Sequence, residues 1–231
     1  MKNSLLTKPQ LQTISKSLLF QSIPPSSLEL IFRDLTADII SYPDPTLIAS
    51  EGEVCSGISL VLEGSVAVKK LHLSGKETTI TELKPGDTFG EVIIFSDHKH
   101  FPSSLFSEKN TVILYISETA ILRLCKLKPE FLKNLMGLLS NKVWMMSNKV
   151  RILSYDRLKQ RVAMYLMDQY RMQGSPSINL PHNRQEMADY LGMPRPSLSR
   201  ELQNLKDQGL IRYHKNHFTL LQPEKLEALI Q

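Results

Sequence analysis

Four side chains near residue 200 have the types and the spacing needed to read DNA. They are Arg195, Ser197, Ser199 and Arg200. An arginine can donate two hydrogen bonds to guanine in the major groove, and a serine can reach bases or phosphates. On a helix of about 3.6 residues per turn, Arg195 and Arg200 lie within about 140° of each other, so both could enter one groove. The pattern predicts double-stranded DNA as a partner.

The elements that must hold these side chains can be read from the flanking residues. Ala188 is small where two helices would have to approach, Gly192 permits a tight turn, and Pro196 suits the first turn of a helix. The apolar residues form the packing face of a helix pair: Met187, Leu191, Leu198, Leu202 and Leu205. A strand pair follows around residues 215–216, so we expect a winged helix-turn-helix rather than an ordinary helical hairpin with solvated charges.

Further basic residues lie outside the second helix of this pair. Arg184, Arg212 and Lys215 are expected near the phosphate backbone. The charge distribution agrees with this expectation. Residues 150–231 hold 12 Lys and Arg against 8 Asp and Glu, a net charge of +4, whereas residues 1–149 hold 16 against 15, or +1. The basic excess of the chain therefore lies in its last third, which is compatible with a nucleic-acid partner.

The middle of the chain has a different pattern. From Asp38 to about Arg123, short β-prone runs such as 58–62, 66–68 and 111–116 alternate with turn residues. Many short strands at this spacing predict a sandwich, jelly roll or barrel, and such a body often encloses a small-molecule pocket. We expect an α+β chain: an N-terminal β jelly roll (residues 1–127), a long dimerisation helix and hinge (128–155), and a winged helix-turn-helix domain (156–231).

A long helix is predicted from about Lys128. Its apolar residues recur every three or four positions over about six turns, as in one helix packing along another. A helix lying on the β body of its own chain is the alternative, but the length and narrowness of the seam favour a homodimer. The expected interface consists of Leu132, Leu135, Leu139, Val143, Met146, Val150 and Leu153.

Several segments together resemble the CRP/FNR family of transcription regulators. They are 184–186, 195–200 and 207–211 in the last third, and 64–68 and 85–91 in the β region. The resemblance covers nearly the whole chain. It implies a cyclic-nucleotide-binding-like effector domain, a homodimer on a two-fold symmetric operator, and RNA polymerase as a further partner. It also implies that Arg195 and Arg200 read guanines. Pro196 stands where the family commonly has a glutamate that reads cytosine, so that base preference is not carried over.

The resemblance places an effector pocket at Gly90, Glu91, Ser103 and Ser104. In members that bind cyclic AMP, an arginine about ten residues after the glutamate holds the phosphate, but this chain has Phe101-Pro102 there. We therefore expect no cyclic nucleotide. Two cysteines, Cys55 and Cys125, exclude a four-cysteine iron–sulfur cluster. Haem stays open through His72, His98, His100 or Cys55, so the effector and any cofactor are unidentified.

Other function classes fit less well. A jelly-roll module that binds an effector without regulating transcription would not need the winged helix. No arrangement of nucleophile and base or of clustered metal ligands suggests an enzyme. No apolar run approaches the roughly 20 residues of a membrane span, and no signal peptide is apparent, so we expect a cytoplasmic protein without a membrane partner.

Overall fold

The computed structural model describes residues 6–34, 37–72 and 77–230. The chain divides into two compact units, residues 1–141 and 142–231, and the division lies within the helix α4 (Pro129–Leu153). The expected domain boundaries, at residues 127 and 155, fall instead at the two ends of this helix. The reason is that Phe131 and Leu135 of α4 belong to the first core, while Ile152 belongs to the second.

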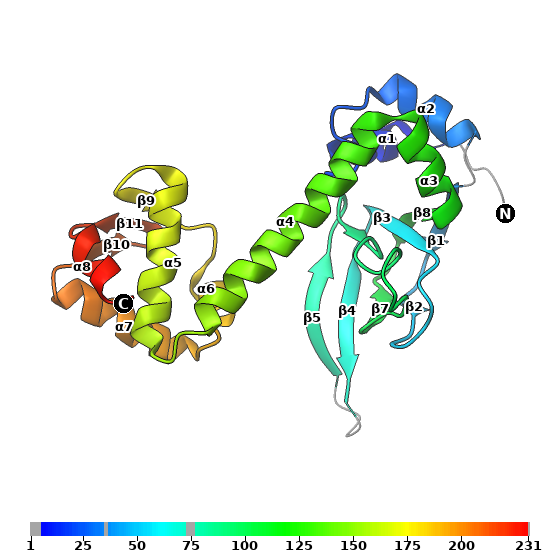
Figure 1. The fold of residues 1–231 in the computed structure, drawn as a ribbon. Coiled ribbons are helices and arrows are strands. Elements are labelled where there is room, and N and C mark those ends of the chain that lie inside the picture. The colour runs from blue at the N-terminus through cyan, green and yellow to red at the C-terminus, as the bar shows by residue number, and fades with distance from the viewer. Residues whose placement is uncertain (1–5, 35–36, 73–76, 231) are drawn as a thin grey trace. The chain divides into compact units, whose positions relative to one another are not determined.

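The N-terminal unit is built on two four-stranded antiparallel sheets (Figure 1). The first sheet has the order β1-β8-β3-β6 and comprises β1 (Ala37–Tyr42), β8 (Thr111–Ser117), β3 (Gly57–Glu63) and β6 (Thr88–Phe89). The second has the order β2-β7-β4-β5 and comprises β2 (Thr46–Ala49), β7 (Ser104–Ser107), β4 (Val66–Leu71) and β5 (Glu77–Leu83). The expected β jelly roll is therefore present.

Side chains along the strands point alternately to the two faces of the first sheet, and this gives the unit two cores. Val61 and Ile113 point between the two sheets, where Val66 and Leu105 meet them. Their neighbours in sequence, such as Leu60 and Leu114, point to the opposite face of the first sheet. Three helices cover that face together with the start of α4: α1 (Lys8–Lys16), α2 (Pro25–Asp34) and α3 (Glu118–Leu127).

One sequence-based boundary in this unit is wrong. The predicted β region continues to about Arg123, but β8 ends at Ser117, whose side chain accepts a hydrogen bond from the Ala120 N–H and starts α3. The helix α2 begins at Pro25. Proline suits the first position of a helix because its missing N–H would have no partner there.

The C-terminal unit packs four helices on a three-stranded sheet. The helices are α5 (Leu158–Gln173), α6 (Arg184–Tyr190), α7 (Arg195–Asp207) and α8 (Pro223–Ala228). The sheet has the order β10-β11-β9, with β10 (Ile211–His214), β11 (His217–Leu220) and β9 (Ser177–Asn179). The predicted packing face is confirmed, since Met187, Leu191, Leu198, Leu202 and Leu205 are all buried in one core.

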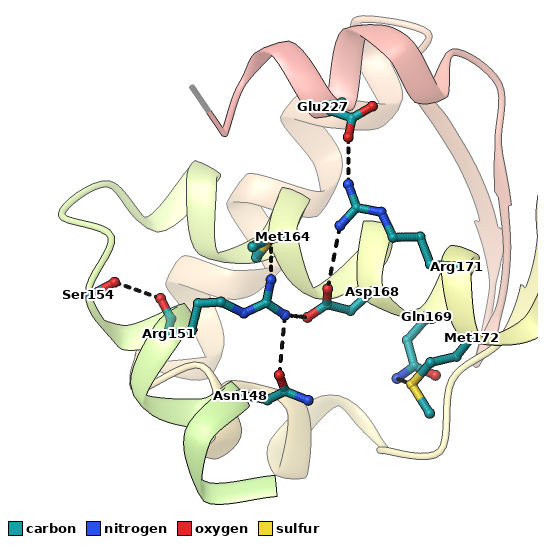
Figure 2. Close-up of polar contacts among 9 residues, drawn as sticks. All are labelled: Asn148, Arg151, Ser154, Met164, Asp168, Gln169, Arg171, Met172 and Glu227. Atoms are coloured by element: carbon teal, nitrogen blue, oxygen red, sulfur yellow. Dashed lines mark hydrogen bonds and ion pairs between the residues drawn. The ribbon is translucent and has the colours of Figure 1, made fainter. Parts of the chain in front are cut away.

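The last turn of α4 belongs to this unit. Arg151 pairs with Asp168 of α5 at 2.7 Å between Nη2 and Oδ2, and Arg171 of α5 bonds to Glu227 of α8 (Figure 2). Ile152 is buried beside these residues in the core. The ion pairs and the apolar contact thus join α4, α5 and α8. No helix in the described ranges is long and apolar enough to cross a membrane.

Candidate DNA interface and effector site

The turn between α6 and α7 is shaped by local hydrogen bonds. Asn183 caps α6 by accepting from the N–H groups of Gln185 and Glu186, and the Glu186 carboxylate accepts in return from the Asn183 N–H at 2.8 Å. Gly192 has φ +61°, a conformation that favours glycine, and the turn closes when the Met193 N–H donates to the Ala188 carbonyl. These contacts fix the direction in which α7 leaves the turn.

The start of α7 presents the four predicted base-reading residues. Arg195, Ser199 and Arg200 are exposed, and Ser197 is partly buried. In the described part of the chain, neither arginine side chain forms an ion pair or a hydrogen bond. The structure therefore leaves both guanidinium groups available at the end of the helix that reaches base edges in helix-turn-helix proteins.

The hairpin of β10 and β11 is the wing. Tyr213 and Phe218 are cross-strand neighbours that point inward, whereas Arg212 is exposed on the other face. Lys215 is exposed in the turn, where it has φ +52°. Arg212 and Lys215 thus present positive charge on the wing, as expected for phosphate contacts.

Arg184 differs from its expected role. Its guanidinium lies 5.0 Å from the ring centre of Tyr213 and 4.9 Å from that of Phe218, and its Nη2 donates to the Lys215 carbonyl at 3.0 Å. Burial lowers the pKa of Arg184 below its usual value. In this structure the side chain is directed into the wing, because two stacked aromatic rings offer a cation a favourable face. We correct the predicted phosphate contact to a structural contact within the domain.

The predicted dimer seam lies along α4 and falls into two parts. Leu135 is only 4% exposed and packs in the N-terminal core, and Leu139 is partly buried against the same core. Leu135 is therefore corrected to a core residue, because the helix lies on its own β body in this stretch. The other predicted residues are exposed: Leu132, Val143, Met146, Val150 and Leu153.

Sequence analysis missed Met136, which is exposed and follows Leu132 by one helical turn. Its spacing in the seam could have identified it. Trp144 and Met145 are also exposed on α4, outside the seam. The apolar surface of the helix is therefore centred on residues 143–150, where 68% of Val143 and 69% of Met146 are accessible.

The predicted effector residues come from two places. Gly90 follows β6 with φ +92°, and a Cβ there would lie 2.4 Å from the Gly57 carbonyl oxygen, so only glycine fits. Glu91 is 4% exposed. Ser103 and Ser104 are buried at the start of β7, in the other sheet, and the Ser104 hydroxyl accepts from the Glu51 N–H. These residues line the interior rather than an exposed surface.

Phe101 is the residue that the sequence resemblance places where a cyclic phosphate would need a cation. Its backbone pairs with residues 52–53, and its side chain packs against both cores of the N-terminal unit. The nearby Lys99 ammonium is engaged by Glu118 at 3.0 Å. A phosphate requires charged or N–H donors, and a phenylalanine ring supplies none. The residues at this position do not fit a cyclic nucleotide.

The remaining candidate ligands are dispersed. The Cys55 thiol is buried and donates to the Gly57 carbonyl, and burial raises the pKa of this thiol. His98 and His100 are exposed, and the His72 ring bonds to the Thr78 hydroxyl. Across residues 6–34, 37–72 and 77–230, no group of three or more His, Cys, Asp or Glu side chains is placed to hold a metal ion.

Two family models match the chain. A model described as a cyclic nucleotide-binding domain matches residues 39–128, and one described as a Crp-like helix-turn-helix domain matches residues 160–229. The two matches correspond to the two compact units. Both parts of the expected resemblance are therefore found, on either side of α4.

Curated relatives span nearly the same length. The cyclic AMP receptor protein of Thermus thermophilus is 28% identical over 196 residues, which is 85% of this chain and 88% of that protein. The cAMP-activated global transcriptional regulator CRP of Pasteurella multocida is 27% identical over 180 residues, 76% of this chain and 86% of that protein.

Solved structures of related regulators are similar to this chain over nearly its whole length. The crystal structure of the Thermus thermophilus catabolite activator protein has a TM-score of 0.54 at 26% identity, covering 93% of this chain and 98% of that chain. A CooA mutant from Carboxydothermus hydrogenoformans, with a TM-score of 0.58 at 20% identity over 98% of each chain, shares the fold.

Proposed function

The chain belongs to the CRP/FNR family of transcription regulators, and from this premise we propose that it binds its operator as a homodimer through α7 and the wing. The observation that carries the proposal is the pair of exposed arginines, Arg195 and Arg200, on the first turns of α7. No carboxylate of the described chain pairs with them, while the core beneath α7 consists mainly of aliphatic and methionine side chains. These two guanidinium groups are free to donate hydrogen bonds to acceptors outside the protein.

Distinct roles follow from where each side chain lies. Arg195 and Arg200, with Ser197 and Ser199 between them, contact base edges in the major groove and carry sequence preference. Arg212 and Lys215 contact phosphates, which strengthens binding to every sequence and makes it sensitive to salt. Arg184 supports this surface from inside the wing.

Dimerisation uses the exposed part of α4. Val143, Met146 and Val150 form an apolar strip of the kind that a second copy of the same helix covers in a two-stranded coil. A two-fold dimer presents two recognition helices to successive major grooves, about 34 Å apart. We therefore propose an inverted-repeat operator, with RNA polymerase as the further partner in regulation and the cytoplasm as the place of action.

The N-terminal unit is proposed to receive the regulatory signal. Its buried residues Gly90, Glu91, Ser103 and Ser104 mark the interior where the effector would act. Because Phe101 replaces the cation that a cyclic phosphate needs, the signal differs from a cyclic nucleotide. No catalytic role is proposed for this unit.

Selection from random duplex DNA with the full-length protein tests the proposal. We expect enrichment of an inverted repeat whose half-sites lie about one helical turn apart. Enrichment of a single asymmetric site, or no enrichment over the starting pool, would contradict it.

A further inference from the structure

Arg161, on the first turn of α5, bonds to main-chain carbonyls from two separate segments. Its Nε donates to the Tyr155 carbonyl at 2.8 Å and its Nη2 to the Leu153 carbonyl at 3.3 Å. Its Nη1 donates to the carbonyls of Leu191 and Gly192 at 3.3 and 3.4 Å. Leu153 is the last residue of α4, whereas Leu191 directly follows α6 and Gly192 lies in the turn before α7. One guanidinium thus joins the end of α4 to the turn that aims the recognition helix.

The chemistry of this contact is favourable. The last carbonyls of a helix have no partner within the helix and carry partial negative charge. Arg161 meets such carbonyls at the ends of two helices at once. A planar guanidinium with five donors can satisfy several acceptors in fixed directions, which a lysine ammonium cannot do across two segments.

A second observation shows that the same two segments are in close contact. A Cβ built on Gly192 would lie 2.7 Å from Cδ2 of Leu153 and 3.6 Å from Nη1 of Arg161. The turn therefore packs directly on the last residue of α4, at a glycine whose φ is +61°. The ion pair of Arg151 with Asp168 holds the same helical turn against α5 (Figure 2).

We propose that Arg161 is a positioning residue that sets the spacing between the two recognition helices of the dimer. The inference rests on the proposed function, in which two copies pair along α4. If the end of α4 is tied to the turn before α7, the position of α7 relative to the dimer axis is fixed. The distance between the two half-sites that the protein accepts is then fixed as well.

The test uses full-length wild type, Arg161→Gln and the matched control Arg157→Gln. Arg157 is exposed at the start of the same helix, and its replacement removes the same charge. Affinity is measured for the selected operator and for versions whose spacer is one or two base pairs longer or shorter. Each added base pair moves a half-site by about 3.4 Å along the duplex and rotates it by about 35°.

We expect wild type and Arg157→Gln to discriminate strongly against altered spacing. For Arg161→Gln, the ratio of affinities for the selected operator and for operators with an altered spacer should fall about tenfold. This is the size of effect expected from the loss of one charge-assisted hydrogen bond. Its preference among base substitutions within a half-site should stay unchanged, because the exposed surface of α7 is intact. A general loss of stability would weaken all operators equally and leave the spacing preference as it was.

The outcomes separate this inference from the proposed function. A wild-type protein that binds no DNA contradicts the proposed function. A wild-type protein that binds all spacings equally, or an Arg161→Gln protein with the wild-type spacing preference, overturns the inference alone. If Arg161→Gln does not fold, Arg161→Lys replaces it. That variant should lose discrimination by about threefold, since one ammonium can hold only part of the acceptor set, and an unchanged preference there also overturns the inference.

Discussion

The two units of this chain differ in whether the side chains at their candidate binding positions are exposed or packed inward. In the C-terminal unit, an apolar core supports α7 from below and leaves Arg195 and Arg200 exposed to solvent. In the N-terminal unit, Phe101, which the sequence resemblance places at the position of a phosphate-binding cation, packs inward against both cores. Each unit nevertheless matches a family model, the first one described as a cyclic nucleotide-binding domain and the second one described as a Crp-like helix-turn-helix domain.

The difference shows that a fold and its ligand chemistry are specified by different residues. The jelly roll needs alternating apolar residues in its strands and glycines such as Gly90 where two backbones approach. None of these requirements involves the residue that would bind a phosphate. A regulator can therefore keep the architecture of an effector domain while responding to a different signal.

The largest effect should come from the part of α4 that would pair with a second copy. Replacing Val143 and Met146 with glutamate would place unpaired charges in an apolar interface, at a cost of about 3–5 kcal/mol or more. We expect monomers in light scattering and a loss of operator affinity of at least about a hundredfold. A double variant that remains dimeric would show that the interface lies elsewhere.

Met145→Glu is the matched control for this experiment. Met145 is 60% exposed, compared with 69% for Met146, and lies about 100° round the helix from it. Its replacement adds one negative charge to the same helix outside the seam, compared with two in the double variant. This variant should stay dimeric and bind the operator like wild type.

The same helix shows how far sequence reasoning could go. The apolar period predicted α4 and its seam, and the exposed residues 143–150 follow that prediction. The period could not show that Leu135 is buried in its own chain, because an apolar residue is equally suited to a core and to an interface. That distinction depends on where the β body ends, which is a tertiary property.

Arg184 and Arg212 give a second example. Both are basic residues beside the recognition helix, and the sequence assigned both to phosphates. The structure separates them because Tyr213 and Phe218 meet across the wing and offer Arg184 two aromatic faces. Pairing across strands is set by the register of β10 and β11, which the residue types alone did not reveal.

The helix α3 was missed for a simpler reason, since its apolar residues continue directly from those of β8.

A smaller effect should follow from Arg200→Ala. Removing a bidentate contact to one base should cost about 1–3 kcal/mol on the best operator and relax the preference at one base pair of each half-site. Lys215→Ala is the comparison, because a phosphate contact should weaken all sequences about equally and reduce the salt dependence of binding. Competition with operators substituted one pair at a time distinguishes the two. A uniform loss across all operators for Arg200→Ala would assign Arg200 to a phosphate.

The smallest effect is expected when cyclic AMP is added to the wild-type protein, an experiment that tests the N-terminal unit at Phe101. A ligand present at a hundred times its Kd stabilises a folded protein by about 2.7 kcal/mol, which would raise the melting temperature by several degrees. For the wild-type protein we expect no shift and no change in operator affinity, because Phe101 offers the cyclic phosphate neither charge nor a donor. The variant Phe101→Arg with Pro102→Ser is the comparison, because it supplies the missing cation and hydroxyl within the same jelly roll. A thermal shift confined to this variant would place the barrier to nucleotide binding at these two residues. A shift in the wild-type protein would mean that other donors hold the phosphate and that the contrast between the two units is wrong.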